Sequence, residues 1–134
     1  WYLHGYSVSN GATLENINTI NLNAKYDNGI LLSGNSNATN SGTINVNSTN
    51  SLAILSGDGK GNIVNSSTGI INLNEVTSGI ATKGYSSAIF TGTILNDGLI
   101  LAKKGGSGIF AYGSQYSKGG DIININLAAN SCIF

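Results

Sequence analysis

The hexapeptide GTINVN at residues 42–47 decides the fold of this chain, because close copies of it recur along the sequence. The copies are TINLN at 19–23, GIINLN at 69–74 and DIININ at 121–126. Within each copy apolar and polar residues alternate, which is the period of a β-strand with one buried face. We therefore predict a strand that turns Ile, Leu and Val inward and Asn outward.

The repeat keeps its register along the chain. The first apolar residues of the copies serve as anchors and lie 23 to 29 residues apart: Ile20, Ile44, Ile71, Ile100 and Ile123. A second apolar patch follows every anchor, at residues 28–32, 51–55, 78–82, 107–111 and 130–134. Repeats of this length are typical of arrays in which each unit stacks on the next.

These observations predict an all-β fold, a right-handed parallel β-helix (β-solenoid) of about five coils with spacings of 23–29 residues. Left-handed β-helices built from hexapeptides have shorter coils of uniform length. The longer gaps between repeats carry Ile63–Val64 and Ile94–Leu95, which we interpret as a third strand that the short coils lack. Corners with left-handed backbone are expected at Gly and Asn residues, namely Gly34, Asn40, Gly42, Gly57, Asn65, Gly84, Asn96 and Gly98.

Residues 1–134 are expected to form a single β-helical segment, a fragment of a longer repeat array, because the last coil stops at Phe134 without a polar cap. Charge is sparse and balanced, with six Lys, no Arg and six acidic residues, so we expect no nucleic-acid partner and no insertion into a membrane. Cys132 is the only cysteine and cannot form an internal disulfide.

Outward-facing asparagines should stack in two columns if the anchors are aligned. One column comprises Asn21, Asn45, Asn72 and Asn124, and the other Asn23, Asn47, Asn74 and Asn126. The fourth coil interrupts both columns with Leu101 and Lys103. Stacked Asn amides form hydrogen-bonded ladders, so a structural role is favoured over a glycan-binding face. An ice-binding face is disfavoured, because the interruption and the uneven coils break a regular lattice.

The repeat resembles the passenger domains of type V autotransporters, particularly the large, Asn-rich adhesins of fusobacterial type. The resemblance extends from about Gly11 to Phe134 and is carried by GTINVN with SLAIL, by GIINLN with SGIAT, and by NDGLIL at 96–101. It implies a right-handed β-helical stalk that is secreted through the outer membrane by a C-terminal barrel. The ligands of that family differ between members, so the resemblance implies no ligand here.

Candidate catalytic and metal-binding residues are few, and we predict no enzyme activity, no metal site and no cofactor. His4 is the only histidine, and Glu15 and Glu75 occupy non-equivalent positions in their coils. The Asp residues lie in turns, where turn chemistry accounts for them. Asp58, in SGDGKGN at 56–62, lacks the recurring spacing of a calcium-binding repeat.

Aromatic residues gather late in the chain and give the one candidate ligand-facing surface. Tyr112 and Tyr116 flank a Gly-Ser-Gln corner, next to the charge doublet Lys103–Lys104. A tyrosine ring at such a corner either stacks on a sugar or packs on the neighbouring coil. Phe110 is expected in the core or stacked over Ala81.

The sequence therefore predicts a non-enzymatic, extracellular stalk or binding segment of a bacterial surface adhesin. Its partners would be a glycan or protein of a host or bacterial surface, and neighbouring coils or copies at the uncapped ends. The alternatives are a self-assembling solenoid filament and a fragment of a polysaccharide-acting β-helix protein. Paired acids on one face would favour the latter.

Overall fold

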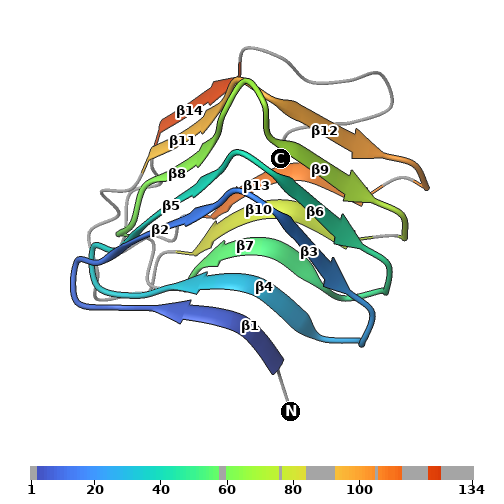
Figure 1. Ribbon diagram of the computed structural model, residues 1–134, viewed down its shortest axis with the longest axis horizontal. Helices are drawn as coiled ribbons and strands as arrows, with labels where there is room; N and C mark the ends of the chain where they lie inside the picture. Colours follow the sequence, from blue (N-terminus) through green and yellow to red (C-terminus); the bar gives the residue numbers. More distant parts are fainter. Residues whose placement is uncertain are drawn as a thin grey trace.

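The computed structural model describes residues 3–57, 60–75, 77–83, 93–104, 106–112 and 121–124, and the regular structure within them is entirely β-strand. Figure 1 shows a chain that winds in successive coils, each of which lies on the one before. In the described part, each strand pairs in parallel with the strand three places later in chain order. The prediction of an all-β parallel solenoid is confirmed.

Three parallel sheets, named here A, B and C, form the sides of the solenoid. Sheet A contains β1 (Leu3–Val8), β4 (Asp27–Leu32), β7 (Leu52–Ser56), β10 (Thr77–Lys83) and β13 (Gly106–Tyr112). Sheet B contains β2 (Thr13–Asn16), β5 (Asn37–Asn40), β8 (Ile63–Asn65), β11 (Thr93–Asn96) and β14 (Asp121–Asn124). Sheet C contains β3 (Thr19–Leu22), β6 (Thr43–Val46), β9 (Ile70–Leu73) and β12 (Leu99–Ala102).

Inward-facing aliphatic side chains stack in columns and form the core. In sheet C, Ile44, Ile71 and Ile100 are register partners, and all three are fully buried. Ile20 pairs with Ile44 at the end of this column and is only partly buried. Burial of one such side chain contributes about 1.5–3 kcal/mol, so the columns supply the main driving force for stacking.

The predicted alignment of the fifth anchor, Ile123, with the other four is wrong. Ile123 lies in β14 of sheet B, where it pairs with Leu95, and not beside Ile100 in sheet C. The alternation in DIIN is the same as that in GIIN, so the period of the pattern does not distinguish one sheet from another. The anchors Ile20, Ile44 and Ile71 do align with Ile100 as predicted.

The prediction that short coils lack the third strand was also wrong. Ile63 and Ile94 do lie in paired strands of sheet B, β8 and β11. The strands β2 and β5, however, extend the same sheet into the shorter coils. In β5 the inward apolar side chain is Ala38, which is buried beside Ile63. A strand that reads NATN carries little hydrophobic signal, because the neighbouring coils supply most of its apolar environment.

Corner residues meet two different requirements: a left-handed backbone at some positions and space for a close backbone approach at others. Gly34 has the expected left-handed backbone, with φ 58°. The other positive φ angles among the described residues fall at Asn10, Gly11, Tyr26, Asn35 and Asn50, so the predicted corners at Asn40, Gly42, Gly57, Asn65, Asn96 and Gly98 do not use this conformation. Gly42 is required by space instead, because a Cβ atom there would overlap the carbonyl oxygen of Asn18. Gly84 lies outside the described residues.

Candidate functional site

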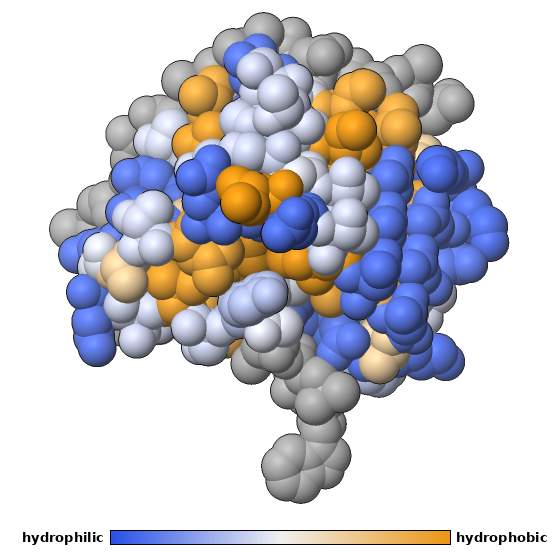
Figure 2. All heavy atoms as spheres, viewed as in Figure 1, coloured by the Kyte–Doolittle hydropathy of each residue, from blue (hydrophilic) through white to orange (hydrophobic). Residues whose placement is uncertain are grey.

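Two asparagine ladders run along the outer side of sheet C, as the sequence predicted. In the first, the Nδ2 of Asn45 donates to the Oδ1 of Asn21 at 2.9 Å, and the Nδ2 of Asn72 donates to the Oδ1 of Asn45 at 2.8 Å. These residues alternate with inward-facing Ile, Leu and Val and are register partners, so their amides form one row on the outer side of the sheet. In Figure 2, hydrophilic side chains gather on the right-hand flank, where sheet C lies.

The second outer ladder lies just beyond the ends of the same strands. Asn47 donates to Asn23 at 2.9 Å, and Asn74 donates to Asn47 at 2.6 Å, in each case from Nδ2 to Oδ1. The first ladder stops at β12, where Leu101 is the register partner of Asn72. The predicted interruption in the fourth coil is therefore confirmed at Leu101.

A third ladder is buried, and the sequence pattern did not predict it. Its members end successive strands of sheet B, at Asn16, Asn40, Asn65 and Asn96. The Nδ2 to Oδ1 distances along the chain order are 2.8, 2.9 and 2.8 Å. The last three of these side chains are fully buried, and Asn16 is 8% exposed.

The amides of Asn16, Asn40 and Asn65 in the buried ladder also close the corner between sheets B and C. The Nδ2 of Asn40 lies 3.2 Å from the carbonyl oxygen of Gly42 and 3.4 Å from that of Ile70 in the next coil. Asn65 repeats this arrangement with the carbonyl oxygens of Gly69 and Leu99. A buried polar group needs such partners, since an unpaired one costs about 1–3 kcal/mol. The signal in the sequence is an Asn that closely precedes a Gly, in NSG at 40–42, NSSTG at 65–69 and NDG at 96–98.

Asn124 belongs to the column of this buried ladder and not to the outer one. Its register partner is Asn96, because β14 pairs with β11. The prediction that Asn124 follows Asn72 on the outer face was therefore wrong, for the same reason as the anchor Ile123. Asn126 lies outside the described residues.

The predicted ligand-facing surface is described only in part. Lys103 and Lys104 are both exposed, and the Nζ of Lys104 forms an ion pair with the Oε1 of Glu75 at 2.9 Å. Tyr112 ends β13, with Lys83 as its register partner. Its side chain, and the whole of Tyr116, lie outside the described residues, so this prediction stays untested. Phe110 is the register partner of Ala81, beside which it was expected to lie.

The acidic residues that are described do not gather into a site. Glu15 accepts a hydrogen bond from the hydroxyl of Ser41 at 2.9 Å on sheet B, whereas Glu75 follows β9 of sheet C. Among the described residues there is no group of three or more His, Cys, Asp or Glu side chains that could hold a metal ion. The same part of the chain contains no helix long and apolar enough to cross a membrane.

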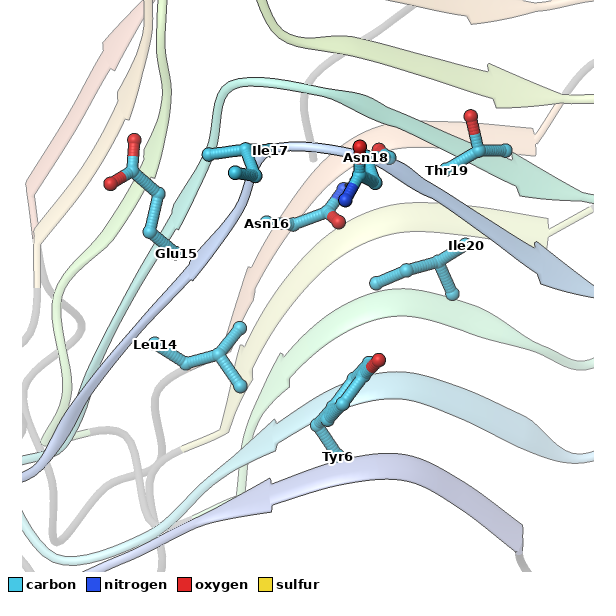
Figure 3. Close-up of a pocket in the computed structure, with 8 residues that line it drawn as sticks. All are labelled: Tyr6, Leu14, Glu15, Asn16, Ile17, Asn18, Thr19 and Ile20. Carbon is cyan, nitrogen blue, oxygen red and sulfur yellow. Dashed lines mark hydrogen bonds between the residues drawn. The ribbon is translucent and has the colours of Figure 1, made fainter.

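A hollow of about 190 Å³ lies at the end of the stack formed by the first coil. Figure 3 shows that Tyr6, Leu14 and Ile20 lie around it, and Asn16 lies at its upper edge. Phe134, where the sequence predicts an uncapped end, lies outside the described residues.

No family model, curated protein or solved structure matches this chain.

Proposed function

We propose that this chain is a non-enzymatic, extracellular β-helical segment of a bacterial surface adhesin, a stalk or binding segment of an autotransporter passenger domain. The observation that carries the proposal is the set of Asn ladders, which join coil to coil on the outer side and at the buried corner. Every added coil brings its own ladder contacts, so the same device extends a stiff rod of any length.

The composition supports the same proposal. The chain has 9% charged residues and one cysteine, so its polar surface consists chiefly of Asn, Ser, Thr and Gly. A rod of this kind relies on neither disulfides nor strong electrostatic attraction, which suits a segment that folds outside the cell. We propose a right-handed coil, since crossover connections between parallel strands are almost always right-handed.

Labelling of the cells that produce the protein tests its location. Antibodies raised against residues 1–134 should stain intact cells, and brief protease treatment of those cells should remove the stain. Staining that needs permeabilised cells would contradict an extracellular stalk. An intracellular protein of the same cell serves as the control for leakage.

Within this function, we propose the surface around Lys103, Lys104, Tyr112 and Tyr116 as the place where a surface glycan or protein binds. Lys103 and Lys104 are both exposed, which supports this assignment. A glycan array and binding to whole cells would test it, with the double variant Tyr112→Ala and Tyr116→Ala. Binding should fall at least tenfold in that variant and stay unchanged in Tyr26→Ala. Equal binding by both variants would contradict the assignment.

A further inference from the structure

The outer side of sheet C changes from polar to apolar at β12. In β3, β6 and β9 the middle outward position holds Asn21, Asn45 and Asn72, whose amides form the first outer ladder. In β12 the same position holds Leu101, the register partner of Asn72. The leucine gives up a ladder hydrogen bond without adding to the core, so the stacking of coils does not account for it.

Leu101 belongs to a cluster of three aliphatic side chains on this side of the sheet. Leu99 precedes it by two residues on the same strand, and the register partner of Leu99 is Ile70. The alternate residues Ile100 and Ala102 are buried in the core, so the two leucines point outward. Ile70 is 37% exposed, and both leucines are partly exposed.

We name these three residues, Ile70, Leu99 and Leu101, the aliphatic patch. In Figure 2 hydrophobic atoms gather at the upper right, where Figure 1 places β12. Single apolar side chains are common on protein surfaces, whereas a contiguous group marks a contact with another molecule.

The aliphatic patch lies between one acidic and one basic residue. Asp97 precedes β12 at the corner with sheet B, and Lys103 follows β12. Lys103 is exposed, and Asp97 is partly exposed. The ion pair found in the described part of the chain joins Lys104 to Glu75 and uses neither of these charges. Both charges can therefore pair with groups of another molecule.

The order of the outward residues along this segment is self-complementary. Asp97, Leu99, Leu101 and Lys103 form the series acid, apolar, apolar, base, which is symmetric about Ile100. If a second copy crosses this strand in the antiparallel sense, Asp97 of each copy faces Lys103 of the other. A two-fold contact has this property, because residue i meets j and residue j meets i. A parallel crossing would instead bring like charges together, at a cost in free energy.

We propose that the aliphatic patch is the contact of a symmetric dimer, in which two copies of this chain pack the outer sides of sheet C face to face with their β12 strands antiparallel. Sheets packed in this way lie about 10 Å apart, a space that the side chains of both inner faces fill. The patch contributes three aliphatic side chains per copy, so the interface belongs to the weak class and the dimer dissociates on dilution. The association needs no ligand, so it is independent of the adhesin proposal.

Sedimentation equilibrium of residues 1–134 tests the assembly. Measured from dilute solution to the highest soluble concentration, the average mass should rise with concentration and level off at twice the mass of the chain. A chain that stays monomeric throughout would overturn the proposal. Growth beyond a dimer would also overturn it, because a two-fold contact closes on itself.

Exchange of the two charges tests the antiparallel arrangement. Asp97→Lys makes two pairs of lysines face each other in the dimer, and Lys103→Asp makes two pairs of aspartates do so. Each variant alone should raise the dissociation constant at least fivefold. An equimolar mixture of the two should associate as the natural chain does, because every charge in the mixed dimer meets its opposite.

The fold should accept both charge variants. In the preceding coils the position of Asp97 holds Ser41 and Ser66, and that of Lys103 holds Asn47 and Asn74. Single variants that associate like the natural chain, or a mixture that fails to recover association, would contradict the paired charges.

A substitution within the aliphatic patch and a matched control locate the contact. Leu101→Asn places an amide beside Asn72 of the same chain, so the variant should fold, yet its dissociation constant should rise at least tenfold. Leu95→Asn makes the same change at a partly exposed, outward side chain of sheet B, beside Val64, and should leave association unchanged. Association that survives in Leu101→Asn, or that falls equally in Leu95→Asn, would exclude the patch as the contact.

Discussion

Asparagine side chains form both exposed and buried hydrogen-bonded ladders in this protein, and the two kinds of ladder differ in their effect on stability. On sheet C the amides of Asn21, Asn45 and Asn72 are at least partly exposed, so water competes for each hydrogen bond. At the corner between sheets B and C, Asn40 and Asn65 are fully buried, and no water replaces their partners. The buried ladder should therefore matter far more for stability.

Replacement of Asn65 by Ala tests this difference. The change removes a buried amide that donates to Asn96 at 2.8 Å and accepts from Asn40 at 2.9 Å. We expect a loss of at least about 2 kcal/mol in the free energy of unfolding, because two buried groups lose a partner. Chemical denaturation measures it. The control Asn47→Ala, in an exposed ladder, should cost less than about 1 kcal/mol. Equal costs would contradict the assigned roles.

Gly42, at the tight corner between sheets B and C, provides a second test of contacts made by single residues. Gly42→Ala introduces a methyl group into the carbonyl oxygen of Asn18, so the corner must move. A loss of about 1–3 kcal/mol is expected, as for other overpacked sites. Gly57→Ala is the matched control, because its methyl group would lie 3.5 Å from the Cδ1 of Leu31, an ordinary contact. Thermal melting of both variants should show a lower transition temperature for Gly42→Ala alone.

At the scale of the strand, sequence patterns succeeded where alternation and burial coincide. The strands of sheet C were predicted because each places two aliphatic side chains inward, as Ile44 and Val46 do in β6. The strand β5 was missed because Ala38 is its only apolar residue. Ile123 was misplaced because alternation carries no information about which sheet a strand joins.

Sequence patterns also predicted only some of the asparagine ladders of the candidate site. The outer ladders were predicted from alternation, since Asn21 and Asn45 lie between inward residues. The buried ladder was not predicted, because Asn40 and Asn65 were interpreted only as corner residues. Their burial depends on the corner glycine, which lets the backbone of successive coils approach closely. That approach involves residues distant in sequence, so a local pattern does not reveal it.

Extending an outer ladder by one rung tests the role of strand pairing. Leu101 is the register partner of Asn72, so Leu101→Asn should place a new amide next to an existing one. We expect a gain of about 0.5–1.5 kcal/mol from the added hydrogen bond, measured as a higher denaturation midpoint. The control Leu99→Asn pairs with Ile70 and gains no such partner. A midpoint that rises equally in both variants would show that simple loss of exposed apolar surface is responsible.

The whole molecule is a stack in which each coil depends on its neighbours. The core columns and the buried ladder run through successive coils, so stability accumulates coil by coil. Charge contributes little, since the ion pair between Glu75 and Lys104 is exposed to solvent. The fold therefore depends on short-range contacts between neighbouring coils.

Salt should consequently have a small effect on the stability of the intact chain. At moderate ionic strength, salt screens exposed charges that lie more than about 8–10 Å apart and weakens exposed ion pairs, whereas the amides of a buried ladder carry no net charge to screen. We expect the free energy of unfolding to change by less than about 1 kcal/mol when the NaCl concentration is raised from low to physiological values. Urea denaturation at the two salt concentrations measures this. A much larger loss in salt would indicate that electrostatic attraction holds the coils together.

The central claim is that a buried asparagine column joins the coils, and hydrogen exchange of side-chain amides tests it most directly. By NMR, the Nδ2 protons of Asn40 and Asn65 should exchange with solvent as slowly as backbone amides of the core strands. Those of Asn47, on the exposed ladder, should exchange quickly under the same conditions. Fast exchange at Asn40 and Asn65 in the folded protein would contradict the buried ladder and the coil-to-coil register that it requires.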